Sequence, residues 1–342
     1  MKNWWKYLSV ALLLYVIVVS LNTPLGPGLT AVSPENLNTG ENSEIKVIGY
    51  NTHFRNNPPD MQHPGVWLES DGFHLTCNNV EVIDDQELHF SVEVPDELPS
   101  KSLHVFVSYD EGTFMLPNAF RAEQSVKNDQ LKNEAPESFS GSVTAFYFPN
   151  REILRESIRN LMFHVPMWFT MMLLMTISVV YSIKYLSGLN PDHDLIARQA
   201  VNVGLLFGIL GLLTGSLWAR FTWGQWWVSD TKLNGAAITT LIYFAYTILR
   251  GSINEEQNKA RVAAVYNVFA YVILIVLLMV LPRLTDSLHP GNGGNPAFSS
   301  YDLDNALRTV FYPAVLGWMG ISLWILQLRN RTERIKQQIE NA

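Results

Sequence analysis

From about Leu161 onward, the sequence is divided into apolar runs as long as a membrane is thick. A helix needs roughly 20 mainly apolar residues to cross about 30 Å of hydrocarbon, and within lipid its backbone polar groups must be satisfied by the helix itself. The runs therefore predict five membrane-spanning helices: about Leu161–Ile183, Val201–Ala219, Leu233–Leu249, Val262–Leu281 and Leu307–Leu328. The content of charged residues, 16%, agrees, because soluble domains carry about a quarter.

The N-terminal stretch "WWKYLSVALLLYVIVVSL" resembles a signal sequence, with Lys2 and Lys6 at its start. No clear Ala-x-Ala cleavage site follows, which favours a retained transmembrane anchor over residues 1–22. With the five later runs, the sequence predicts a polytopic α-helical membrane protein of six spans.

Positive charges predict the orientation of these spans. The loops expected on one side carry Lys184, Arg198, Arg250, Lys259 and Arg261, and the tail after the last span adds Arg329, Arg331, Arg334 and Lys336. The opposite side has only Arg220, Lys232 and Arg283 near the membrane. The positive-inside rule therefore predicts that both termini, including the tail of residues 331–342, are cytoplasmic and that "FTWGQWWVSD" (residues 221–230) is extracytoplasmic.

The region between the anchor and the later runs has the pattern of a β-domain. In residues 25–122, "SEIKVIGY", "VEVIDD", "ELHFSVEV" and "LHVFVSY" are rich in β-formers and separated by turn residues, which predicts an extracytoplasmic all-β sandwich. Its "VSP" start, the turn at Gly40 and the strand ending at Gly49 resemble an IPT/TIG immunoglobulin-like module. Residues 123–150 are polar and charged, as expected of a linker.

The composition of the chain excludes several functions. The formal net charge of −7 argues against a nucleic-acid partner, and the single cysteine, Cys77, excludes an intramolecular disulfide framework. Five histidines of the β-rich region match no metal-ligand spacing, so we expect ordinary polar histidines: His53, His63, His74, His89 and His104. Phosphate loops, nucleophile elbows and zinc motifs are absent from the sequence.

The polar residues of interest gather at the predicted outer ends of the spans. His164 begins the second span, His289 follows the fifth, and the Trp-rich segment joins the third and fourth. Two imidazoles from separate segments are suited to bind opposite faces of one planar iron complex, and tryptophan faces provide flat, polarisable area. Arg220, Lys232 and Arg283 are the cations available to haem propionates. Together these groups favour a haem site.

Each residue also has an ordinary interpretation that the sequence leaves open. Trp223, Trp226 and Trp227 suit an interfacial anchoring belt. A single histidine near a helix end is commonly a satisfied polar residue, and Asp230 is suited to cap the following helix. A haem site is favoured because His164, His289 and the Trp-rich segment are all predicted on one face of the membrane.

The same segments resemble a known family. "LLTGSLWARFTWGQWWVSDTKL" is similar to the WWD signature of the haem-handling proteins of cytochrome c maturation, most of all the CcmC-type haem exporter family. "FHVP" resembles that family's "LHVP", and "SLHPG" its second histidine. The resemblance covers about residues 155–328 of the predicted membrane domain (151–330).

This resemblance implies a function for the residues that match. His164 and His289 would be the axial iron ligands of a b-type haem, and the platform beneath it would comprise Trp223, Gly224, Trp226, Trp227 and Asp230. The protein would be a multi-pass protein of the bacterial inner membrane that passes haem to a membrane-tethered haem chaperone. It would work with ABC transporter subunits and perform no catalysis itself.

Two positions depart from the family pattern, and two other functions remain open. Ser229 occupies the place of a tryptophan, and Lys232 replaces an arginine and loses bidentate geometry toward carboxylates, so contacts at the platform need not follow the family. One alternative is a haem lyase of the WWD group, which would attach haem to apocytochrome c. The other is a scaffold without haem, anchored by its tryptophans.

Overall fold

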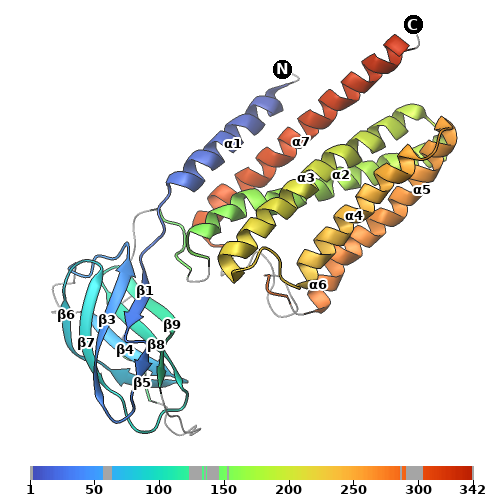
Figure 1. Cartoon of the computed structure of the whole chain (residues 1–342). Helices are drawn as coiled ribbons and strands as arrows, with labels where there is room; N and C mark the ends of the chain where they lie inside the picture. Colours follow the sequence, from blue (N-terminus) through green and yellow to red (C-terminus); the bar gives the residue numbers. More distant parts are fainter. Residues whose placement is uncertain are drawn as a thin grey trace. The chain divides into compact units, whose positions relative to one another are not determined.

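The computed structural model describes residues 3–56, 64–122, 133–134, 136, 146–151, 154–285, 287–289 and 303–340. The chain forms two compact units (Figure 1). The helical unit comprises Met1–Thr23 and Glu156–Ala342, and the β unit comprises Pro24–Arg155. The interrupted helical unit follows from the sequence, because the polar β-forming region is inserted between the first apolar run and the others.

A helix lies at each of the six places where an apolar run predicts one. The helical elements are α1 (Trp4–Asn22), η1 (Arg155–Asn160), α2 (Leu161–Gly188), α3 (Pro191–Trp223), α4 (Thr231–Gly251), α5 (Glu256–Ile275), η2 (Val276–Val280), α6 (Leu281–Leu284) and α7 (Asn305–Glu340). The segment predicted as a tail is thus helical as far as Glu340. Asn190 caps α3 by accepting a hydrogen bond from the backbone N–H of Asp192, with Pro191 at the first helical position, where proline is favoured.

Five of these helices are long and apolar enough to cross a membrane: α1, α2 with η1, α3, α5 through α6, and α7. The chain is therefore a multi-pass membrane protein with a β-rich region. Helix α4 is not among the five, because threonine, asparagine and charged residues lower its apolar content. Its 21 residues still measure about 31 Å. The six-span topology and the sidedness of the termini stay predictions.

The helical unit is a bundle in which α2, α3, α4 and α5 lie side by side, with α1 beside α7 (Figure 1). Small residues permit close packing of the helices. Gly204 and Gly208 of α3 face the flexible side chains of Met175 and Met171 in α2. Between α1 and α7, Gly320 lies directly against the side chain of Ser9.

A buried ion pair links the start of α3 to the end of α4. The guanidinium of Arg250 donates through both terminal nitrogens to the carboxylate of Asp194, with one Nη1–Oδ1 distance of 2.7 Å. Both side chains are largely buried, with 9% and 15% of their surfaces exposed. At the same end, Arg329 of α7 donates to Gln199, so α3, α4 and α7 are held together by polar contacts.

Helix α5 continues into one turn of π-helix before α6. In η2, the N–H of Leu281 donates to the carbonyl of Val276, five residues back, whereas an α-helix uses four. Pro282 follows and has no N–H to donate, which leaves a carbonyl of the preceding turn without its helical partner. The carbonyl oxygen of Leu277 lies close to Gly235 of α4, and a Cβ added to this glycine would be 2.7 Å from that oxygen.

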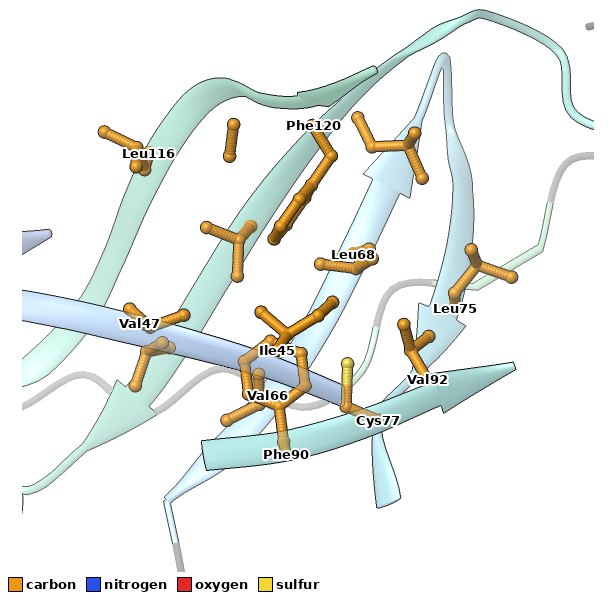
Figure 2. Close-up of a cluster of buried hydrophobic side chains, with 14 of the residues drawn as sticks. Ile45, Val47, Val66, Leu68, Leu75, Cys77, Phe90, Val92, Leu116 and Phe120 are labelled. Atoms are coloured by element: carbon orange, nitrogen blue, oxygen red, sulfur yellow. The ribbon is translucent and has the colours of Figure 1, made fainter. Parts of the chain in front are cut away.

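The β unit consists of two sheets with a shared core. The sheets have the orders β1-β3-β7-β6 and β2-β9-β8-β4-β5, with all pairs antiparallel except β2–β9. The strands are β1 (Gly28–Ser33), β2 (Asn36–Leu37), β3 (Asn42–Tyr50), β4 (Gly65–Ser70), β5 (Phe73–Thr76), β6 (Asn78–Val82), β7 (Glu87–Glu93), β8 (Ser102–Tyr109) and β9 (Gly112–Ala122). Alternate residues of both sheets point into one apolar core (Figure 2), among them Ile45, Leu68 and Phe90.

The two glycines behind the IPT/TIG resemblance have clear structural roles. Gly40 adopts a φ of +78°, a left-handed conformation that disfavours residues with a Cβ. Gly49 lies so close to Thr52 and Phe54 that a side chain would collide with both. These roles explain the residues without establishing the family of the module, so the immunoglobulin-like assignment stays a prediction.

Candidate functional site

His164 lies one turn into α2 and is oriented by α3. Its Nδ1 is 3.1 Å from the carbonyl oxygen of Gly211 and 3.2 Å from the hydroxyl of Thr214. That hydroxyl donates to the backbone of its own helix, and a carbonyl only accepts. The proton of the imidazole is therefore on Nδ1, which leaves the lone pair of Nε2 available to a metal.

The ring of His164 is confined on several sides. Trp168 and Trp218 meet it edge-on, with ring centroids 6.4 Å and 5.7 Å away. Gly215 lies so close that an added Cβ would be 2.6 Å from Cε1 of the imidazole. The absence of a side chain at Gly215 therefore leaves the space in which the ring meets the carbonyl of Gly211.

His289 lies in the segment after α6 and is held by the α3–α4 connection. Its Nδ1 is 3.2 Å from Oδ1 of Asp230, an ion-pair distance, although the direction of approach does not make a well-aligned hydrogen bond. The indole of Trp223 meets the imidazole edge-on at 5.1 Å between centroids. The backbone N–H of His289 donates to the hydroxyl of Ser287 at 3.1 Å.

Asp230 connects the start of α4 to the segment that carries His289. Its Oδ1 accepts the backbone N–H groups of Lys232 and Leu233 at 2.9 Å and 3.3 Å and so caps α4. Its Oδ2 accepts the N–H of Leu288 at 2.8 Å. Burial opposes ionisation, but the adjacent imidazole of His289, the Leu288 N–H and the Ser287 side chain outweigh it and hold the pKa of the Asp230 carboxyl well below its usual range.

The other tryptophans of the segment have a different environment from Trp223. Trp226 and Trp227 are 59% and 40% exposed, and Trp227 donates from Nε1 to the side chain of Asn234 at 3.3 Å. Gly224 ends α3 with a φ of +73°, a helix-ending conformation that glycine adopts readily. The segment thus presents one tryptophan to His289 and leaves two with large exposed faces.

The three predicted cations come from the same group of helix ends. Arg220, in the last turn of α3, is exposed and donates to the carbonyl oxygen of Gly224. Lys232 is half-buried in the first turn of α4, and Arg283 is exposed in α6. Arg220 therefore stabilises the C-terminal turn of α3 while its side chain remains exposed.

The structure brings the predicted residues into two groups. The first surrounds His164, and the second contains Trp223, Asp230 and His289. The sequence interpretation missed the residues of α3 that hold His164. A signal for them is present in "GLLTG" (residues 211–215), because glycines four residues apart form one open face of a helix.

The histidines of the β unit have protein partners. His63 lies outside the described residues, and the others are engaged as follows: His53 with Glu111, His74 with Asn133, His89 with Glu87, and His104 with the backbone N–H of Asn118. Within the described parts of the chain, no group of three or more His, Cys, Asp or Glu side chains is arranged to hold a metal ion.

His164 and His289 of the helical unit each have one ring nitrogen close to a protein oxygen. Each Nδ1 faces an oxygen atom, the Gly211 carbonyl for His164 and the Asp230 carboxylate for His289. Ligating histidines usually present their second nitrogen to a carbonyl or carboxylate in this way, which fixes the tautomer and orients the ring. Each imidazole therefore has the chemistry of a histidine that ligates haem iron.

Comparisons with known proteins show a family whose name refers to haem. Residues 133–342 match the protein family described as "Heme exporter protein C" (CcmC). The chain is 30% identical over 178 residues to the "Heme exporter protein C" of Bradyrhizobium diazoefficiens, covering 52% of this chain and 68% of the relative. The protein of the same name from Paracoccus denitrificans is 24% identical over 194 residues, which is 57% of this chain and 80% of that one. "Cytochrome c biogenesis protein CcsA" of Prochlorococcus marinus is 32% identical over 87 residues, 25% and 28% of the two chains.

Proposed function

The chain belongs to the heme exporter protein C family, and from this premise we propose that it binds haem for cytochrome c biogenesis and delivers it without forming a bond of its own. The haem is b-type and sits at the extracytoplasmic face of the bacterial inner membrane. The observation that carries the proposal is that both imidazoles have Nδ1 near a protein oxygen, 3.1 Å from the Gly211 carbonyl for His164 and 3.2 Å from the Asp230 carboxylate for His289, so that each ring can present Nε2 to iron.

The residues around the two ligands have different roles in binding the porphyrin. Trp223 packs edge-on against the imidazole of His289. The exposed faces of Trp226 and Trp227 provide the flat surface that contacts the macrocycle. Arg220, Lys232 and Arg283 are the candidates for the propionates, through charge-assisted hydrogen bonds. Ser229 is exposed and replaces the flat indole that the family pattern would place there.

Delivery requires a site from which haem can leave. The second ligand is carried by a segment outside the helices, and two of the tryptophans are exposed, so an incoming ligand from a partner can reach the porphyrin edge. We propose that the receiving partner is a membrane-tethered haem chaperone, and that ABC transporter subunits of the maturation system act with this protein. The β unit, predicted on the same side, is available for docking.

Absorption spectroscopy of the purified full-length protein tests the proposal. We expect a Soret band in the wild type that is shifted or lost in His164→Ala and in His289→Ala. His193, the other histidine of the helical unit, lies at the first turn of α3, and His193→Ala serves as the matched control that keeps the band. A wild type without a Soret band, or alanine variants with an unchanged one, would refute haem ligation by these residues.

A second measurement separates delivery from catalysis. When the protein is co-expressed with an apocytochrome c and no other assembly factor, we expect no covalent haem product. A covalent product would replace the delivery function with that of a lyase. Haem-free protein that still binds assembly subunits would indicate a scaffold.

A further inference from the structure

We propose that Asp230 is a positioning residue for the haem ligand His289, because its carboxylate bonds the backbone of the segment that carries the imidazole and lies next to the ring nitrogen Nδ1. This inference rests on the proposed function, because it assigns Asp230 a role behind the ligand rather than in the platform under the porphyrin. The supporting observation is a single buried carboxylate that caps its own helix and also bonds a backbone N–H 58 residues further along the chain.

The two carboxylate oxygens contact different parts of the chain, which supports this role. Oδ1 accepts the N–H groups of Lys232 and Leu233 and also lies 3.2 Å from Nδ1 of His289. Oδ2 accepts the N–H of Leu288. The carboxylate is therefore fixed by α4 on one side and fixes the backbone next to the ligand on the other.

Other capping residues of the helical unit show what capping alone requires. Asn190 accepts the N–H of Asp192 at the start of α3, and Asp304 accepts the N–H of Leu307 at the start of α7. Each of these two bonds stays within three residues of the capping residue. Asp230 is only 5% exposed and reaches into a distant segment, which a cap has no need to do.

The chemical consequence concerns the strength of the iron ligand. A carboxylate that accepts from Nδ1–H makes the imidazole more basic at Nε2 and fixes its orientation. The negative charge close to the site also favours ferric over ferrous iron. Loss of the charge should therefore weaken haem binding about 10- to 100-fold and raise the midpoint potential, by about 59 mV for each tenfold preferential loss of ferric haem.

Chemical rescue isolates the contact between Asp230 and the imidazole. In His289→Gly, added imidazole should bind iron through one nitrogen and donate from the other to Asp230, which restores the Soret band. 1-Methylimidazole binds iron but has no N–H to donate, whereas 4-methylimidazole carries a methyl group and keeps its N–H. We expect imidazole and 4-methylimidazole to rescue at concentrations about 10- to 100-fold lower than 1-methylimidazole.

The double variant His289→Gly with Asp230→Asn provides the decisive comparison. Asparagine still caps a helix well but has no charge, so the preference for ligands with an N–H should fall to near one. An unchanged preference in the double variant would overturn the inference. If no imidazole restores the band, the midpoint potential of the bound haem is measured in the single variants. We expect Asp230→Asn to raise this potential and the capping control Asp304→Asn to leave it unchanged. Equal potentials in the two variants would overturn the inference.

These outcomes remain separate from a failure of the proposed function. A wild-type protein without haem would refute the function itself before any variant is made. A wild type that binds haem through His289, together with an Asp230→Asn variant of identical potential and rescue preference, would leave the function intact and reduce Asp230 to a helix cap.

Discussion

Replacing Gly215 with alanine should weaken haem binding while leaving the fold as stable as before. An added Cβ would lie 2.6 Å from Cε1 of His164, about 0.8 Å inside the 3.4 Å at which ordinary van der Waals contact begins. The ring must retreat from α3, and the bond from Nδ1 to Gly211, now 3.1 Å, then exceeds hydrogen-bond length. The loss of that bond costs about 1 kcal/mol, whereas alanine favours a helix interior over glycine by about 1 kcal/mol.

The lost hydrogen bond and the gain in helix propensity nearly cancel in the free energy of unfolding. The displaced position of the imidazole remains. A ligand that loses its second-nitrogen partner binds its metal about 10- to 100-fold more weakly. We expect Gly215→Ala to keep its unfolding midpoint and to need correspondingly more haem to saturate the Soret band. The assay is a haem titration of detergent-solubilised protein, with thermal unfolding of the same sample.

Gly208→Ala is the matched control, because it makes the same change in the same helix. Its added Cβ would meet the sulfur of Met171 at 2.9 Å, but an unbranched thioether side chain can move aside. Wild-type haem affinity in Gly215→Ala, or an equal loss in both variants, would refute the conclusion that Gly215 sets the position of His164.

Three further predictions concern the framework. Asp194→Ala leaves Arg250, 8% exposed, without its buried partner and should lower the free energy of unfolding by about 3–5 kcal/mol; denaturant unfolding measures this, and Asp194→Leu with Arg250→Met should recover most of it. Burial raises the pKa of the Cys77 thiol to about 12, so iodoacetamide near pH 8 should label it only after unfolding, and rapid labelling of the folded protein would contradict its burial. Gly320→Leu would collide with Ser9 and should abolish disulfide cross-linking between cysteines placed on α1 and α7, whereas persistent cross-links would show that the helices dock elsewhere.

Local patterns in the sequence predicted the helices and several of the strands. Apolar runs of sufficient length are a direct consequence of burial in lipid, and a helix lies at every one of them. The β-forming stretches correspond to β3, β6, β7 and β8. Strand β9 has Pro117 in its interior, where the pairing with β8 shifts register. Proline is typical of such irregular positions, but it hides the strand from a search for regular alternation.

The sequence was enough to name candidate residues for the site, but not the contacts that join them. The capping role of Asp230 is local and follows from a residue type that precedes an apolar run. Its second bond, to Leu288, joins segments 58 residues apart and has no local signal. The same holds for the contact between His164 and Gly211, 47 residues apart. Platform residues such as Trp226 could be proposed from the Trp-rich segment and its resemblance to the WWD signature, whereas the partners that orient the ligands required the fold.

The π-turn of η2 has a consequence for how sequences of this kind should be compared. A hydrogen bond that reaches back five residues encloses one residue more than the α-helical bond, so Val276–Val280 contain a residue that a regular helix would not need. A related protein with a plain α-helix here would be one residue shorter at this point. A one-residue gap in an alignment between α5 and α6 would therefore mark a change of helix type within the span, and the histidines on its two sides would still correspond.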